Sequence, residues 1–121
     1  MDLEKYIRKA AQLDDRNKET LTLDVSGEKF EFHKLDESRY SQILSKLVDV
    51  NGDISKADGL LEELIYYCLP DLHDSELLET FDAVHPPDVV HDIFSSAEIT
   101  KIGVELLEFN DFTSQDIVKK A

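Results

Sequence analysis

The spacing of apolar residues predicts a helix and then a hairpin in the first third of the chain. Apolar residues first recur at the three- and four-residue intervals of one helix face, so the first dozen residues are predicted to form an amphipathic helix. The polar run 14–19 is expected to end it. From Thr20 the period changes to two, and after Ser26-Gly27 the alternation resumes, which predicts a hairpin with a tight turn at Gly27. The apolar positions are Leu3, Tyr6, Ile7 and Ala10 in the helix, and Leu21, Leu23, Val25, Phe30 and Phe32 in the hairpin.

Helical spacing returns after the hairpin and is divided by turn residues into short segments. Asp36 is placed to cap a helix that Asn51-Gly52 should break. Ser55 and Asp58 have the spacing of a capping box for a second helix. That helix should stop before Pro70, because the residue preceding a proline resists the helical conformation. The apolar stripes are Tyr40, Ile43, Leu44, Leu47 and Val48 in the first helix, and Leu60, Leu61, Leu64, Ile65, Cys68 and Leu69 in the second.

Three further helix starts follow in close succession. Asp74 opens a short helix, and Pro86-Pro87 should force an extended step before another. Ser95 and Glu98 form a capping box for a third helix, and a last turn or two is expected from Thr113. The predicted fold is α+β and mostly helical, with an N-terminal helix and β-hairpin over residues 1–35. A compact bundle of short helices over residues 36–121 completes a single domain.

The charge of the chain narrows the classes of partner. Thirteen basic and twenty-seven acidic residues give a formal net charge of -14, which repels phosphate backbones and anionic lipid headgroups. We therefore expect no binding to nucleic acid or to membranes. The N-terminus lacks the apolar core of a signal peptide, and no apolar run is long enough to span a bilayer, so action in a cytoplasm is expected. A hydrophobic fraction of 41% argues against intrinsic disorder.

Residues that could carry chemistry are better explained by structural roles. Asp49, Asn51 and Asp53 have the spacing of calcium ligands, but the position of the turn glycine holds Ile54 and that of the final glutamate holds Leu60. The histidines His73, His85 and His91 lack the i, i+4 spacing of a helical metal site. Cys68, the only cysteine, lies among apolar residues and should be a buried thiol. No catalytic residue, metal or cofactor is expected, and we predict that the protein is not an enzyme.

Several large apolar side chains are candidates for a partner-binding surface. Tyr66 and Tyr67 are adjacent and point about 100° apart on a helix, so they cannot both face the same core. Phe109 and Phe112 follow the last clear helical stripe. The simpler alternative is that these side chains close the ends of the core. The predicted partner-binding set is Tyr66, Tyr67, Phe81, Val90, Phe94, Phe109 and Phe112. Within it, Tyr67, Phe81, Val90 and Phe94 are predicted to line a groove for an apolar helical segment.

The order of short motifs between about residues 60 and 112 resembles one known family. Pro70 is followed by Leu72, Asp74 by Glu76-Leu77, and Pro87 by Val89-Val90; Glu98-Ile99 then precede the segment that ends near Phe112. This order is similar to that of the tail assembly chaperones encoded by phages and prophages of Gram-positive bacteria. The chain differs from the usual beginning of the family in having a full amphipathic helix before the hairpin.

The resemblance implies a function in tail morphogenesis. A tail assembly chaperone holds the tape measure protein, a long helical client, in a soluble state and helps to recruit tail tube subunits such as the major tail protein. It acts in the host cytoplasm and is absent from the mature virion, and a longer form is often made by frameshifting. Many copies coat one client, so we expect weak self-association. The basic cluster of Lys5, Arg8 and Lys9 would contact acidic helices of the next copy.

Two other classes of protein remain open. An acidic phage protein of this size could be an inhibitor that mimics DNA, although its acidic residues are spread over every segment rather than set in a double row. A generic adaptor domain with an unrelated protein partner is the third possibility. A very long helical reading frame immediately downstream of the gene would favour the chaperone.

Overall fold

The computed structural model describes residues 1–57 and 59–112, and within them the elements follow the predicted order. The α+β, mostly helical fold with an N-terminal helix and a hairpin is confirmed. The α-helices are α1 (Leu3–Asn17), α2 (Glu37–Asp49), α3 (Leu60–Cys68), α4 (Ser75–Thr80), α5 (Val89–Ile93) and α6 (Ser96–Phe109). The strands are β1 (Thr20–Val25) and β2 (Glu28–His33), and the 3-10 turns are η1 (Ile54–Lys56), η2 (Pro70–His73) and η3 (Pro86–Asp88).

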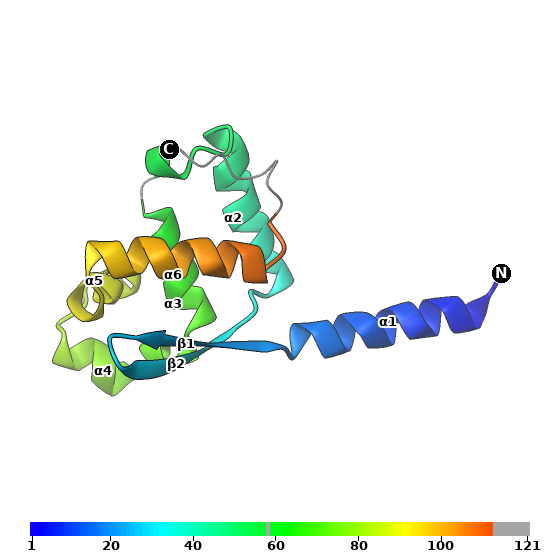
Figure 1. Cartoon of the computed structure of the whole chain (residues 1–121), viewed down its shortest axis with the longest axis horizontal. Coiled ribbons are helices and arrows are strands. Elements are labelled where there is room, and N and C mark those ends of the chain that lie inside the picture. Colours follow the sequence, from blue (N-terminus) through cyan, green and yellow to red (C-terminus); the bar gives the residue numbers. More distant parts are fainter. Residues whose placement is uncertain (58, 113–121) are drawn as a thin grey trace.

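Helix α1 projects away from the rest of the molecule along its longest axis (Figure 1). The Asp2 carboxylate caps it by accepting a hydrogen bond from the Lys5 amide at 3.2 Å. Helix α1 ends inside the polar run 14–19, as expected, but it extends beyond the predicted dozen residues to Asn17. None of these polar residues breaks a helix, and Asp14 pairs with Lys18 one turn later at 2.9 Å. No residue of α1 is buried.

The hairpin joins α1 to the helical body. Its strands pair in register from Thr20 opposite His33 to Val25 opposite Glu28, which leaves a two-residue loop. Ser26 and Gly27 both have positive φ, 55° and 89°, as a type I′ turn requires. On the face toward the helices, Phe32 is fully buried and Phe30 meets the ring of Phe94 edge-on at 5.1 Å. The hairpin is therefore part of the core, as its alternating pattern predicts.

Helices α3 and α6 pack closely at the centre of the body (Figure 1). A Cβ atom on Gly103 of α6 would lie only 2.7 Å from Cδ2 of Leu61, so the absence of a side chain there permits the close approach of the two helices. Helices α2 and α5 cover the sides of α3. The fully buried side chains that form the core include Phe32, Ile43, Leu47, Leu60, Leu64, Ile65, Leu106 and Leu107.

Most helix boundaries follow the local signals in the sequence. Asp36 and Asp74 cap α2 and α4 by accepting hydrogen bonds from backbone amides three residues later, at 2.8 and 3.1 Å. Asn51 and Gly52 end α2 in the left-handed region, with φ of 53° and 75°. Helix α3 ends at Cys68, before Pro70 as predicted. Cys68 itself is buried.

Other boundary predictions are wrong or fall outside the described residues. Ser55 does not cap α3; it lies in η1, and α3 begins after Gly59 in the left-handed conformation, with φ of 72°. Its predicted capping-box partner, Asp58, lies outside the described residues, as does the turn predicted from Thr113. By contrast, the extended step predicted at Pro86-Pro87 is present at His85, and the two prolines then begin the helical turn η3. Val48, predicted to face the core, is exposed.

Helix α6 begins with the capping box that the sequence predicts. Ser95 Oγ accepts a hydrogen bond from the Glu98 amide at 3.2 Å, and the Glu98 carboxylate accepts one from the Ser95 amide at 2.8 Å. The Ser26 hydroxyl of the hairpin donates to the same carboxylate at 2.7 Å. The Ser95 amide, followed by the Ser26 hydroxyl, lowers the pKa of the Glu98 carboxyl. The stability that these hydrogen bonds give to the folded protein is therefore present above the ordinary pKa of glutamate. It is lost as the pH falls through the lowered pKa of Glu98.

Replacing Ser95 by Ala should lower the free energy of unfolding by about 1 kcal/mol, because the Glu98 amide loses its cap. Ser96→Ala is the matched control, since Ser96 is the next residue and exposed. Urea unfolding of the two variants measures the difference. Equal stability of the two variants would contradict a capping role for Ser95.

Candidate protein-binding surfaces

An open groove of about 740 Å³ lies between η2 and α4. Pro70 ends the preceding helix and begins η2, whose Leu72 is buried and anchors the turn to the core. Asp74 then caps α4, which is only six residues long, so the chain leaves the helix early and Phe81 stays 41% exposed. The groove, called the acidic groove below, is lined by Pro70, Asp71, His73, Asp74, Glu76, Leu77, Thr80 and Phe81.

The acidic groove combines apolar contact area with negative charge. Pro70, Leu77 and Phe81 provide the apolar area. Asp71 and Glu76 form no ion pair with any residue in the described part of the chain. A ligand that suits this groove presents apolar side chains flanked by basic ones.

His73 connects the groove to the end of α3. Its Nε2 atom lies 2.7 Å from the backbone oxygen of Tyr66, and its ring lies 4.4 Å from the ring of Tyr66. A carbonyl oxygen only accepts, so Nε2 is the donor. Burial, followed by the neighbouring Tyr67, raises the pKa of the Tyr66 hydroxyl, and Arg39 opposes this effect. The hydrogen bond from His73 to the Tyr66 backbone therefore attaches this wall of the groove to α3.

A second apolar surface runs along α1. Leu3, Tyr6 and Ile7 are 60%, 58% and 60% exposed, and together with Leu13 they form what we call the α1 stripe. Arg8 lies 4.0 and 3.8 Å from carboxylates of its own helix, Asp2 and Glu4. Among the described residues, Lys5 and Lys9 have no acidic partner. The outer part of α1 therefore exposes both apolar and basic side chains.

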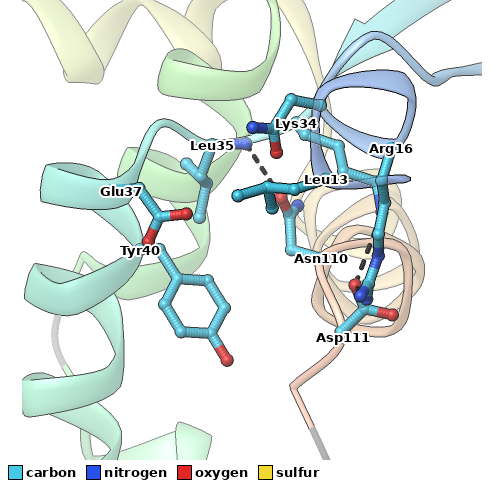
Figure 2. Close-up of a pocket in the computed structure, with 9 residues that line it drawn as sticks. Leu13, Arg16, Lys34, Leu35, Glu37, Tyr40, Asn110 and Asp111 are labelled. Carbon is cyan, nitrogen blue, oxygen red and sulfur yellow. Dashed lines mark hydrogen bonds and ion pairs between the residues drawn. The ribbon is translucent and has the colours of Figure 1, made fainter. Parts of the chain in front are cut away.

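The C-terminal end of α1 is attached to the body at a small pocket of about 280 Å³ (Figure 2). Arg16 forms an ion pair with Asp111, and Lys34 Nζ lies 3.4 Å from the same carboxylate. Nearby, the buried Asn110 side chain accepts a hydrogen bond from the Leu35 amide at 2.8 Å. Figure 2 shows Leu13 beside Asn110, at the inner end of the α1 stripe. Of these interactions, the Arg16–Asp111 pair joins α1 to the body, and the other two join the segment after β2 to the residues that follow α6.

The structure places three of the predicted partner-binding residues in the core. Val90 is fully buried, and Phe94 and Phe112 are each only 4% exposed. Phe112 stacks on Tyr40 at 4.6 Å between ring centroids. These side chains cannot line an exposed groove in this structure, so that part of the prediction is corrected. The physical reason is that α5 packs against α3 and α6, and that Phe94, which follows α5, and Phe112 belong to the same core.

The other predicted residues are at the surface to different degrees. Tyr66, Tyr67 and Phe109 are half-buried. The Arg39 guanidinium lies 4.0 Å from the centre of the Tyr67 ring, and Lys34 Nζ lies 4.9 Å from the centre of the Phe109 ring. These rings are therefore partly covered by the protein's own cations. Phe81 is the member of the predicted set that lines the acidic groove.

The sequence-based reasoning did not identify Pro70, Asp71 and Leu77 as surface partners of Phe81. The sequence feature that indicates this surface is the small number of residues between Asp74, which caps the helix, and Phe81, the last apolar residue at helical spacing. A helix of that length places apolar residues beyond its last turn, where neighbouring helices do not cover them. The exposure of the α1 stripe was also missed, since an amphipathic pattern normally indicates a face packed on a core.

Polar residues that resemble chemical sites have structural partners. Asp53 caps η1, accepting from the Ser55 amide at 3.2 Å and from the Ser55 hydroxyl at 2.6 Å. His91 Nε2 lies 2.9 Å from the Glu62 carboxylate. Within residues 1–57 and 59–112, no group of three or more His, Cys, Asp or Glu side chains could hold a metal ion. No helix in that same part of the chain has the length and apolar character needed to cross a membrane.

No protein-family model, curated protein or solved structure matches this chain. Its function is therefore inferred from the acidic groove, the α1 stripe and the order of motifs between residues 60 and 112. Both surfaces combine apolar side chains with charged ones that form no ion pair among the described residues. Such surfaces are typical of binding to proteins.

Proposed function

We propose that this protein is a phage or prophage tail assembly chaperone that binds the tape measure protein and keeps it soluble. The observation that carries the proposal is the acidic groove, where Leu77 and Phe81 lie beside Asp71 and Glu76, two carboxylates without an ion pair in the part of the chain that the structure describes. An amphipathic helix with basic residues beside its apolar face is the ligand that best fits this chemistry. A long helical client offers many such segments. The motif order around Pro70, Asp74 and Glu98 supports the same family.

The net charge of the chain explains how binding would keep a client dispersed. Each copy brings a formal charge of -14, so a client that carries several copies is surrounded by like charges that repel other coated clients. The groove is open and short, so each contact is reversible. Tail tube subunits, including the major tail protein, can then displace the chaperone in the host cytoplasm, and none remains in the finished virion.

Co-expression with the tape measure protein should increase the soluble fraction of that client. Phe81→Asp should reduce this effect severalfold, because it places a charge among the apolar residues of the groove. Val84→Asp is the matched control, because it makes the same change of charge at a residue that is 96% exposed and does not line the groove. The readout is the soluble fraction of the client after centrifugation of the lysate.

Two results would contradict the proposal. The first is a client whose solubility does not respond to the unchanged protein. The second is a gene without a very long helical reading frame immediately downstream, which would favour an adaptor or an acidic inhibitor. Equal activity of the two variants would leave the chaperone function intact and remove the acidic groove as its binding site.

A further inference from the structure

Arg39 differs from the other arginines of this acidic chain. The sequence contains three arginines and twenty-seven acidic residues. Arg8 and Arg16 each form ion pairs with carboxylates. Within residues 1–57 and 59–112, Arg39 has no such partner. Asp36 accepts a hydrogen bond from the backbone amide of Arg39, not from its guanidinium.

The guanidinium of Arg39 is oriented by neutral side chains. It lies 4.0 Å from the centre of the Tyr67 ring, and its Nη1 atom donates a hydrogen bond to Oε1 of Gln42 at 3.1 Å. No residue that the structure describes accepts from the edge formed by Nε and Nη2. Arg39 is half-buried, so stacking on Tyr67 restricts its side chain before any partner binds.

A row of aromatic rings connects Arg39 to the acidic groove. The Tyr67 ring lies 5.4 Å from the Tyr66 ring, and the Tyr66 ring lies 4.4 Å from the ring of His73, which lines the groove. Both tyrosines belong to α3, which lies between α2 and α4 in Figure 1, and both are half-buried. A partner that fills the groove can therefore also reach Arg39 along these rings.

We infer that Arg39 binds a carboxylate side chain of the same protein segment whose apolar and basic side chains occupy the acidic groove. Arg39, Gln42 and Tyr67 form what we call the Arg39 subsite. The unused edge of the guanidinium can donate a pair of parallel hydrogen bonds to one carboxylate. A phosphate group, which has a higher charge, would be repelled more strongly by a chain of formal charge -14.

The Arg39 subsite would select among segments by the spacing of their charges. Asp71 and Glu76 at the groove favour basic side chains, whereas Arg39 favours an acidic one. The three contact distances between Arg39 and His73 limit their separation to a length that a helix covers in about nine residues. A bound helix therefore carries an acidic residue within about three turns of its basic residues. That the segment belongs to the client rests on the proposed function, whereas the subsite itself does not.

Binding of designed helical peptides to the full chain tests the inference. Each labelled peptide carries the same stripe of leucines with one pair of lysines beside it. A single glutamate is placed at successive helical turns on either side of the lysine pair, so both directions of a bound helix are covered. Fluorescence anisotropy measures the affinity. At the best position, the glutamate peptide should bind about tenfold more tightly than the same peptide with glutamine.

Arg39→Gln should remove the preference for glutamate and leave the binding of the glutamine peptide nearly unchanged. Arg8→Gln is the matched control, because it makes the same change of charge on α1, outside the groove, and it should keep the preference. Arg39→Lys should restore only part of it, since lysine lacks the planar pair of donors. The inference would be overturned by equal binding of glutamate and glutamine at every position, by binding of none of the peptides, or by a preference that survives in Arg39→Gln.

Co-expression with the tape measure protein separates the Arg39 subsite from the proposed function. If the soluble fraction of the client falls with Phe81→Asp but not with Arg39→Gln, the chaperone function stands and the subsite is overturned for that client. If the peptides show the expected preference but the client does not respond to the unchanged protein, the subsite stands and the chaperone function is wrong.

Discussion

Replacing Phe32 by Ala is expected to lower the free energy of unfolding by about 3–5 kcal/mol. The side chain is fully buried, and it is the point where β2 enters the core. Truncation removes its apolar area and leaves a cavity that the surrounding helices cannot fill completely. Because small domains are stable by only about 5–15 kcal/mol, a substantial fraction of the variant should unfold at moderate urea concentration. Urea unfolding followed by circular dichroism measures the change.

Glu31→Ala is the control for this substitution. Glu31 is the neighbouring residue of the same strand and is exposed on the opposite face, so its removal should change stability by no more than about 0.5 kcal/mol. If Phe32→Ala were as mild as Glu31→Ala, the hairpin would not be packed on the helices.

The thiol of Cys68 should react with a disulfide reagent at pH 8 on the order of 10³ times more slowly in the native protein than in the urea-unfolded protein. The residue is buried, so a reagent reaches it only when the structure opens. Burial also raises the pKa of the thiol to about 12, an effect that the hydrogen bond from Asn110 only partly opposes. The nucleophilic thiolate is therefore scarce as long as the thiol stays buried. Rapid labelling of the native protein would contradict the packing of α3 against α6.

The same pKa shift predicts how stability depends on alkaline pH. Because the folded value is raised above the unfolded value of about 9, the stabilising effect of the neutral thiol is fully present below pH 9. It is lost as the pH rises toward 12. The pKa of Tyr66 is also raised, so the contribution of Cys68 is the difference between the unchanged protein and Cys68→Ala. Parallel pH profiles of the two proteins would show that the thiol does not titrate as expected.

The features that could be predicted from the sequence are those set by residues close together in the chain. Asp36, Asp74 and Ser95 each satisfy a backbone amide three residues away, so a local pattern was enough to find three helix starts. The start of α3 was missed because two local patterns compete near Ser55. Asp53 uses its carboxylate to cap η1, and this leaves the start of α3 to Gly59.

The binding surfaces could not be predicted in the same way, because they depend on contacts between distant residues. Nothing near Val90 shows that α5 is covered on its apolar side, yet the side chain is fully buried. Conversely, the α1 stripe has the spacing of a buried helix face but is exposed. It stays exposed because α1 buries none of its residues, and near its C-terminal end the helix meets the body through Arg16, which pairs with Asp111, 95 residues later in the chain.

The absence of buried residues in α1 has a consequence for the lifetime of any complex that it forms. An isolated helix of about 15 residues is only marginally stable in water, so we expect the helical form of α1 to be in equilibrium with partly unwound forms. A partner that covers the α1 stripe has to offset the conformational entropy of the residues it orders, about 1–2 kcal/mol for each backbone unit that becomes fixed. Much of the contact energy is spent in this way, so the complex dissociates quickly even when its surface is large. A partner bound to the α1 stripe can then exchange without unfolding of the core.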